Sequence, residues 1–555
     1  MPLVPLGLGV QVDTPMMSSE PFLWTGMNIR VRAGAVETLG LFGPLRDVGG
    51  TQVTVHGPDI HRRIFACPSV TTGQVLTGSV SKITLLQYDP TSTPLTGTRW
   101  AKFDVTPAAL PVPPAPGDGI TVPSAGRVEI PPVWWFADQE DLIVGGRANV
   151  AGDSFYVWDR NTINDFTPPV LARHPTDPEW PAPIDVGPAP SPAPTPLPTG
   201  AVAGGIVNRI LVLFGATSID DPGTSKSMTI RWSDRFNFGQ WTPSDITLSG
   251  ELQLEGGSRI VGGGVTGFGV VAWTDKRMAM LRETYDFDVF SRAYVPGGRG
   301  MLANLSWCEA DGRIWWLDET RTLNVYDGGQ PRQVVNTNKY ASIERLSDAQ
   351  AARVYMVPNH EFGEVIIHYP SGTGTECNAQ LVYNYVADCW YPWSLTRSAW
   401  CQRFGVIPNL AIGTDNKVWQ HDLDVALADP WQPVEGASGT PAADVSAVSF
   451  SFESNMIVQP NPGYSSWDTT KITLDYLPAP AVGAVDSFDI EVIGYREPSL
   501  KSVTESETHT FGDGETMHDY RIGGKGIRFK VSGADVKTVY RFGMIDIAGE
   551  IDGER

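Results

Sequence analysis

The sequence predicts an all-β protein, with a β-propeller of about six or seven blades followed by a C-terminal antiparallel β-sandwich-like domain. Three observations predict this fold class. The 555 residues include 58 Gly and 45 Pro, both above ordinary usage, while long amphipathic helical runs are nearly absent. A short motif of Trp and Asp recurs at the spacing of propeller blades. Beyond the last repeat, segments alternate between apolar and polar residues, as strands with one buried face do.

Composition divides the chain into three parts. Residues 1–50 are predicted to be a loop-rich N-terminal segment, residues 51–430 the propeller, and residues 444–555 the sandwich-like domain. The Pro-rich segment 167–200 is predicted to be an extended insertion in the propeller, because closely spaced prolines favour a polyproline conformation without a hydrogen-bonded ladder. This insertion is either a flexible segment or an arm laid over a neighbouring subunit.

The recurring motif is Trp-x-Asp at the end of an apolar, strand-like run. Its three copies are Trp232-Ser-Asp234, Trp273-Thr-Asp275 and Trp316-Leu-Asp318, with steps of 41 and 43 residues between the tryptophans. Repeats of this length that each hold several short strands are typical of propeller blades. We therefore expect the aromatic residue to pack between adjacent blades and the Asp to accept backbone N–H groups of the following turn.

The segment IRWSDRFNFGQWTP at 230–243 places four aromatic residues close together, Trp232, Phe236, Phe238 and Trp241. One interpretation is structural, with these side chains filling the layer between two blades. The other is an exposed aromatic platform that stacks on a sugar or a base. The repeated strand and turn pattern favours the structural interpretation.

The formal net charge is −21, and no basic cluster stands out beyond the short HRR at 61–63. Tight binding of nucleic acid through phosphates needs a basic footprint, so the composition argues against that class of function. An acidic surface keeps a protein in solution, and it also lets DNA pass without adhering, because like charges repel.

Membrane and export signals are not evident in the sequence. The start, MPLVPLGLGV, lacks a basic region followed by a long apolar run, so no secretory signal is expected. The most apolar stretch, 201–216, is interrupted by Asn208 and Arg209 and is too short to span a bilayer. We predict a buried strand there and no membrane span.

The five cysteines form no metal-binding or disulfide pattern. Their number is odd and no CxxC pair occurs, so we expect all five to be reduced and mostly buried. The last three, Cys377, Cys389 and Cys401, are twelve residues apart, which favours equivalent positions on successive strands.

No catalytic, cofactor-binding or metal-ligating residue is predicted, because no known catalytic or phosphate-binding motif is present. His360 and His368 lie in separate segments, and His421 is expected at the surface end of a strand. Asp220 and Asp221 are interpreted as exposed loop acids rather than a Ca²⁺ site.

Two Gly-rich segments, GGRG at 297–300 and GGKG at 523–526, are interpreted as turns, since neither stands between a strand and a helix as a phosphate-binding loop does. The surrounding VPGGRGM at 295–301 is a candidate for a movable gate, because adjacent glycines allow a loop two conformations at low strain.

An ordered set of segments resembles structural tail proteins of tailed bacteriophages, and more narrowly the nozzle proteins of short-tailed phages, the tail tubular protein B class. The resemblance covers about residues 20–50, 205–425 and the last 40. Its weight comes from the order of the segments GMNIRVRAGAVETLGLFGPL, TIRWSDRFNFGQWTP, VVAWTDKRMAMLRETYDFDVF, ADGRIWWLDETRTLNVYDGG, LVYNYVADCWYPWSL and RFGMIDIAGEIDGER. The Pro-rich segment 167–200 departs from the family pattern.

The resemblance implies a hexameric tube in the virion, at the distal end of the tail, attached below an adaptor ring on the portal. Such proteins are made in the bacterial host cytoplasm, hold the genome before infection, conduct DNA during ejection and often carry tail fibres. The resemblance implies no enzyme activity and no cofactor. Passing double-stranded DNA would not be bound tightly.

A second function stays open, that of a glycan-binding or sialidase-like propeller at the host surface. The segment SDRFNFGQW at 233–241 is similar to the Ser-x-Asp-x-Gly-x-x-Trp turn of sialidase propellers, although Asp234 follows Ser233 directly and Gly239 precedes Trp241 by only two. A glycosidase also needs paired carboxylates that face one cleft. This hypothesis predicts that Trp241→Ala abolishes sugar binding.

Overall fold

The computed structural model describes residues 3–5, 23–110, 133–167, 197–423, 446–458 and 467–551, with short internal gaps such as 68–72, 89–99 and 335–342. These residues form strands almost throughout, joined by turns and by the 3-10 helix η2 (Asp348–Arg353). The predicted all-β fold is confirmed. Most of the Pro-rich segment 167–200 lies outside the described residues.

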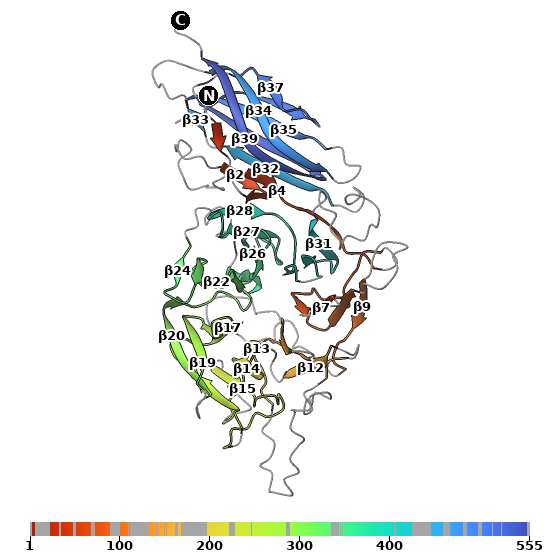
Figure 1. The fold of residues 1–555 in the computed structure, drawn as a ribbon, viewed down its shortest axis with the longest axis vertical. Helices are drawn as coiled ribbons and strands as arrows, with labels where there is room; N and C mark the ends of the chain where they lie inside the picture. The colour runs from red at the N-terminus through yellow and green to blue at the C-terminus, as the bar shows by residue number, and fades with distance from the viewer. Residues whose placement is uncertain are drawn as a thin grey trace.

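Seven antiparallel sheets in the described part of the chain form a β-propeller, and in all but blade 7 the strands follow in sequence order from the centre outward (Figure 1). Blades 1 to 4 are β6 (Arg63–Cys67), β7 (Gly73–Gly78), β8 (Ile83–Tyr88) and β9 (Trp100–Asp104); β10 (Trp134–Gln139), β11 (Leu142–Arg147) and β12 (Phe155–Asp159); β13 (Ala203–Val207), β14 (Ile210–Phe214), β15 (Thr229–Trp232) and β16 (Gly250–Gln253); and β17 (Ile260–Thr266), β18 (Gly269–Thr274), β19 (Arg277–Glu283) and β20 (Phe290–Arg299).

Blades 5 and 6 continue the same pattern, and blade 7 takes its outer strand from the beginning of the chain. They are β21 (Trp307–Ala310), β22 (Arg313–Leu317), β23 (Leu323–Tyr326) and β24 (Arg332–Gln333); β25 (Tyr355–Asn359), β26 (Glu364–Tyr369), β27 (Ala379–Asn384) and β28 (Cys389–Trp393); and β29 (Ala399–Cys401), β30 (Leu410–Ile412), β31 (Val418–Leu423) and β5 (Leu41–Pro44). The seven blades agree with the predicted count of six or seven.

The ring is closed by a strand from the beginning of the chain. β5 pairs with β31 as the outer strand of blade 7, with Gly43 opposite Gln420 and Pro44 opposite Trp419. The first strands of the blades stand side by side, and β29 of blade 7 returns next to β6 of blade 1. The apolar stretch 201–216 supplies β14, whose five residues are all buried, so the predicted buried strand is confirmed.

The C-terminal strands form a sandwich of two sheets at the other end of the long axis (Figure 1). Sheet one has the order β3 (Ile29–Arg32), β4 (Ala35–Thr38), β39 (Thr538–Ile551), β34 (Trp467–Pro480) and β37 (Met517–Tyr520), with β1 (Leu3–Pro5) also on β39. Sheet two has the order β2 (Leu23–Met27), β32 (Val448–Ser454), β38 (Gly526–Val536), β35 (Phe488–Glu497) and β36 (Ser502–Phe511), with β33 (Ile457–Val458) on β38.

Alternating side chains of both sheets meet in one core. β32 alternates buried and more exposed positions, and its Phe450 and Phe452 lie 6.2 and 5.3 Å from the ring of Phe542 on β39. Phe488 of β35 contacts the same ring at 5.2 Å. Aromatic contacts between the facing sheets therefore fill the sandwich, as the alternation of polarity requires.

The N-terminal segment differs from the prediction of a loop-rich region. Residues 23–47 are mainly strand, and four N-terminal strands complete the two sheets of the sandwich while β5 completes the propeller. The strands that pair with this segment explain the difference, because they come from the far end of the chain. For example, Glu37 of β4 lies opposite Arg541 of β39. A strand of four residues gives a weak local pattern, and its pairing across 500 residues leaves no trace in the sequence nearby.

Candidate functional site

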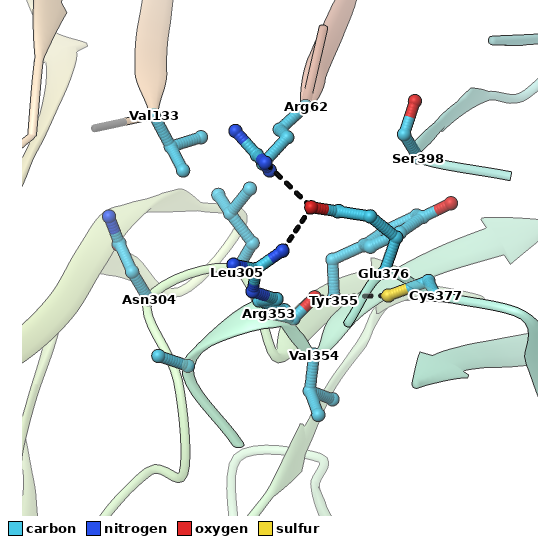
Figure 2. Close-up of a pocket in the computed structure, with 11 residues that line it drawn as sticks. Arg62, Val133, Asn304, Leu305, Arg353, Val354, Tyr355, Glu376, Cys377 and Ser398 are labelled. Carbon is cyan, nitrogen blue, oxygen red and sulfur yellow. Dashed lines mark hydrogen bonds and ion pairs between the residues drawn. The ribbon is translucent and has the colours of Figure 1, made fainter. Parts of the chain in front are cut away.

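A small cavity lies at the central channel of the propeller, where the first strands of several blades begin (Figure 2). Its lining residues include Arg62 just before β6, Val133 before β10, Leu305 before β21, Tyr355 at the start of β25 and Ser398 before β29. Because the first strand of a blade is the innermost, these residues converge on the axis of the ring. The cavity volume of about 20 Å³ admits a water molecule but not a sugar ring.

Two arginines hold one carboxylate in this cavity. Arg62 donates from Nη2 to Glu376 Oε1 over 2.7 Å, and Arg353 at the end of η2 makes an ion pair with the same oxygen (Figure 2). All three side chains are mostly buried. Two cations face one anion here, and the buried Nε of Arg62 donates to no described group. The cluster links blade 1 to blade 6 and leaves one positive charge at the channel.

The chemistry available in the cavity is that of holding a small polar group. Glu376 is the one carboxylate among the lining residues, so this cavity lacks the pair of carboxylates that glycoside hydrolysis uses. Cys377 donates its thiol to the carbonyl of Arg353 over 3.2 Å. Burial raises the pKa of the Cys377 thiol far above neutrality, so it stays protonated and is a poor nucleophile.

The aromatic segment 230–243 is packed between blades and does not form a platform. Trp241 is 1% exposed, its ring lies 5.6 Å from that of Phe155 in blade 2, and its Nε1 donates to the carbonyl of Phe238. Trp232 and Phe238 are also buried, whereas Phe236 is partly exposed beneath the guanidinium of Arg209. The structural interpretation is therefore confirmed for the three buried rings.

The three Trp-x-Asp motifs are not equivalent positions. Trp273 and Trp316 lie in the second strands of blades 4 and 5, and their rings approach to 6.2 Å, but Trp232 ends the third strand of blade 3. The step of 43 residues from Trp273 to Trp316 is therefore the length of one blade repeat, whereas the step of 41 residues from Trp232 to Trp273 is not. The turn-capping role is confirmed for Asp318, whose Oδ1 accepts from the backbone N–H groups of Thr320 and Thr322. Asp275 instead accepts from the backbone N–H of Ser258, which lies before the motif.

The segment 295–301 is not a loop. Residues 290–299 form β20, the outer strand of blade 4, and Gly297 with φ 77° lies where the pairing with β19 shifts register. The adjacent glycines thus serve a β-bulge, which needs a positive φ, and the predicted turn at 297–300 is wrong, while the gate stays a prediction. Asp220 is exposed, whereas Asp221 and Gly523 lie outside the described residues.

The cysteines are all free and buried, which confirms the predicted burial. The twelve-residue spacing does not reflect equivalent strand positions. Cys377 lies in the connection between β26 and β27, Cys389 begins β28, and Cys401 ends β29 in the next blade.

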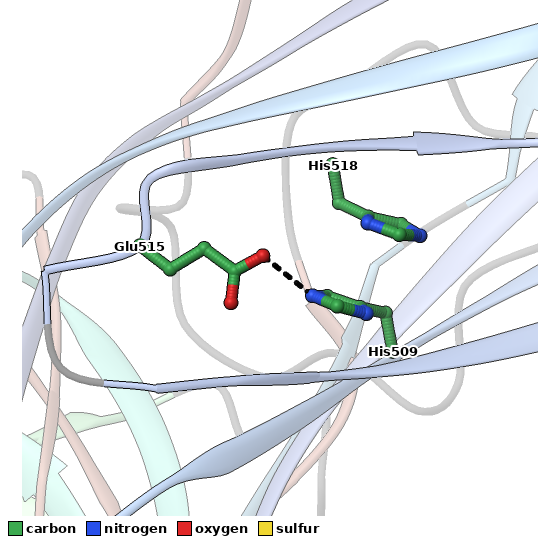
Figure 3. Close-up of side chains that lie close together, drawn as sticks. All are labelled: His509, Glu515 and His518. Atoms are coloured by element: carbon green, nitrogen blue, oxygen red, sulfur yellow. Dashed lines mark hydrogen bonds and ion pairs between the residues drawn. The ribbon is translucent and has the colours of Figure 1, made fainter.

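The predictions for the histidines require two corrections. His421 is 3% exposed rather than superficial, because Phe42 from the N-terminal segment stacks on it at 5.1 Å and Trp400 covers it at 4.2 Å. His509 and His518, for which no metal-like pairing is evident in the sequence, lie together with Glu515 on the sandwich (Figure 3). Their separation of nine residues matches no common spacing of metal ligands. The two histidines come together because the chain crosses from one sheet to the other between them.

A buried ionic centre joins the propeller to the sandwich. Arg30 of β3 donates from Nε to Glu364 of β26 over 2.5 Å and from Nη2 to Asp422 of β31 over 3.1 Å. The three side chains are at most 5% exposed. Burial opposes the charge on Arg30, but the two carboxylates outweigh it and raise the pKa of the guanidinium.

Neutral groups complete the hydrogen bonds of the two carboxylates in this centre. Tyr391 donates its hydroxyl to Glu364 Oε1 over 2.5 Å, and the amides of Asn359 and Asn409 donate to Glu364 and Asp422 over 3.0 and 2.8 Å. The apolar core is continuous at the same place, since residues of blade 6, blade 7 and both sheets belong to one buried cluster.

In the part of the chain that the structure describes, no helix is long and apolar enough to cross a membrane.

No family model matches this sequence, and neither does any curated protein. Solved structures similar to this chain include YCF48 from Cyanidioschyzon merolae, at 11% identity and TM-score 0.33, covering 66% of this chain and 98% of that one. BamB from Moraxella catarrhalis has 9% identity and TM-score 0.33, with 71% and 94% covered. The WD40 domain of Toxoplasma gondii coronin has 8% identity and TM-score 0.34, with 76% and 91% covered.

Proposed function

We propose that this chain is a structural subunit of a bacteriophage tail, forming a hexameric nozzle that closes the distal end of the tail channel, retains the genome and conducts DNA during ejection. Its partners would be further copies of itself, an adaptor ring below the portal and tail fibres. The order of the segments that resemble nozzle proteins supports this assignment, together with three features of the molecule.

The observation that carries the proposal is the rigid joint between propeller and sandwich. Domains that are joined by a linker and a small polar interface move relative to one another by default. Here β1–β4 belong to the sandwich and β5 to the propeller, and Arg30 anchors the joint through two buried carboxylates. Such a joint suits a part of a tube, because it keeps the two domains in a fixed arrangement.

The cavity at the channel supports a structural role over catalysis. It has one carboxylate between two arginines, a protonated thiol and too little space for a sugar. Turnover of a substrate in this cavity is therefore not expected. The net charge of −21 is in keeping with a conduit that double-stranded DNA crosses without tight binding.

The glycan-binding alternative depends on an exposed Trp241 that can stack on a sugar. Trp241 is enclosed between blades 2 and 3 and has no exposed face for stacking on a sugar. A Trp241→Ala variant is thus expected to change stability and not sugar affinity.

The test is quantitative mass spectrometry of purified virus particles from the source culture. The expected result is a stoichiometric virion protein, with about half as many copies as the portal protein, since the nozzle is a hexamer below a larger ring. Absence of the chain from washed particles would overturn the proposal. In that case, screening of the free protein against a polysaccharide panel would decide whether the glycan hypothesis returns.

A further inference from the structure

The open side of the sandwich brings together three potential metal ligands. β36 is the edge strand of sheet two and β37 is the edge strand of sheet one, and the chain crosses between them through residues 512–516. His509 lies on β36, His518 on β37 and Glu515 in the crossing (Figure 3). The three side chains therefore connect two sheets that, among the described residues, share no hydrogen-bonded ladder at this edge.

The geometry of the three groups is compact. His509 Nε2 and Glu515 Oε1 are 2.6 Å apart, and the imidazoles of His509 and His518 stack with centroids 3.6 Å apart and planes at 4°. One ligand atom from each residue lies within 4.8 Å of the others. His509 and Glu515 are 27% and 37% exposed, so an ion and its remaining water ligand can reach them.

One of the three side chains has no hydrogen bond to the described part of the protein. Among the described residues, neither ring nitrogen of His518 has a hydrogen-bond partner, although its ring is stacked on that of His509. A metal ion bound to both imidazoles and to the carboxylate would give each of the three groups a partner. The two rings stack almost in parallel, so one of them has to turn about its Cβ–Cγ bond before a nitrogen of each faces the same ion.

We propose that His509, Glu515 and His518 form a binding site for a divalent transition-metal ion of the zinc class, which ties the two sheets together at the open edge of the sandwich. Two imidazoles and one carboxylate are ligands that suit Zn²⁺, Co²⁺ or Ni²⁺, whereas Ca²⁺ and Mg²⁺ prefer a full set of oxygen ligands. Water would complete the tetrahedral set.

The arrangement of the strands fits this role. Because the ligands come from two edge strands and the crossing between them, bound metal would restrain β36 and β37 against separation. This site does not depend on the tail assignment and would be present in any function of the chain.

A calorimetric titration of the metal-free full-length chain with Zn²⁺ tests the site. One equivalent of Zn²⁺ is expected to bind, and one equivalent of Co²⁺ is expected to give the visible absorption of a tetrahedral ion. Saturating Zn²⁺ is expected to raise the midpoint of thermal unfolding, since it binds the folded state.

Substitutions at the ligands identify the residues that bind. His518→Gln and Glu515→Gln are each expected to weaken Zn²⁺ binding by at least roughly tenfold and to remove the Co²⁺ absorption. The matched control is His360→Gln, because His360 is exposed on the propeller and belongs to no ligand group. Circular dichroism of each metal-free variant confirms that it is folded before titration.

Two results would overturn the proposal. The first is the absence of stoichiometric Zn²⁺ binding to the folded unsubstituted chain, which needs no variant to interpret. The second is binding that His518→Gln and Glu515→Gln leave unchanged, since the ion would then lie elsewhere. Neither result would bear on the virion assignment, which rests on copy number in particles.

Discussion

At Arg30, one guanidinium group faces two buried carboxylates that belong to different blades of the propeller. Removal of the cation leaves both charges without compensation in a site with almost no access to water. Arg30→Met is therefore expected to lower the free energy of unfolding by about 3–5 kcal/mol. Chemical denaturation at neutral pH measures this loss.

The matched control for Arg30 is an exposed pair. Lys417 and Asp415 form an ion pair in which both side chains are nearly half exposed. Lys417→Gln is expected to change the free energy of unfolding by less than about 1 kcal/mol. Equal effects of the two substitutions would contradict the role of Arg30 as the joint between the domains.

Trp241 gives a second prediction at the scale of one residue. Its ring fills the layer between blades 2 and 3, so Trp241→Ala opens a cavity and is expected to cost about 3–5 kcal/mol of unfolding free energy. Val386→Ala, at a side chain that is 77% exposed, is the control and is expected to be nearly neutral. Denaturation midpoints measure both variants. A loss of sugar binding by Trp241→Ala at unchanged stability would favour the glycan hypothesis instead.

At the scale of elements, the N-terminal strands are the ones on which both domains depend. β3 and β4 complete sheet one, β2 completes sheet two, and β5 closes blade 7. Deletion of residues 1–47 is expected to prevent folding of both domains, because it opens the propeller ring and exposes the core of the sandwich. Size-exclusion chromatography is expected to show aggregated protein.

A shorter deletion serves as the control for this prediction. Removal of residues 1–22 takes away β1, which pairs with β39 through three residues, and leaves β2–β5 in place. Its unfolding midpoint is expected to remain close to that of the full chain. A monomeric chain 48–555 with the same midpoint would contradict the closing role of the N-terminal strands.

The same elements explain what the sequence can predict. Turns capped by Asp318 and rings such as Trp273 are local features, so the propeller and its aromatic layers are readable from the order of residues. Pairing of β5 with β31 joins positions nearly 380 residues apart, so no local pattern reveals it. His421 is buried for the same reason, because the ring that stacks on it is Phe42.

The candidate sites were less readable than the fold. The cavity at the channel brings Arg62 of blade 1 to Arg353 and Glu376 of blade 6, and only ring closure places these two blades near each other. His509 and His518 are near in sequence, but their strands belong to different sheets. Helical or hairpin spacing rules for metal ligands therefore miss them.

At the scale of the whole molecule, buried histidines couple stability to pH. His61, His368 and His421 are at most 3% exposed. Burial lowers the pKa of His61 to about 4, and burial together with the charge of Arg397 lowers the pKa of His368 and His421 well below the usual value. All three are therefore neutral in the folded protein at neutral pH.

The sign of the pH effect follows from proton binding. An unfolded histidine has a pKa of about 6.5, so below that pH the unfolded chain binds protons that the folded chain does not. Stability is therefore full above pH of about 6.5 and falls as the pH is lowered. For His61 the pKa difference corresponds to roughly 3 kcal/mol by pH 4, and His368 and His421 add to the loss.

Chemical denaturation at several pH values between about 7.5 and 4.5 measures this loss. His61→Gln is expected to reduce the dependence on pH, because the glutamine amide remains neutral throughout, while an exposed control, His360→Gln, leaves the dependence unchanged. The hydrogen bonds of His61 to Thr77 and to the carbonyl of His56 are lost in part, so the variant is also expected to be less stable at pH 7.5. If the free energy of unfolding depended on pH equally in the full chain and in His61→Gln, the pKa of His61 would not be lowered by folding. The loss of stability in acid would then have to arise from the carboxylates.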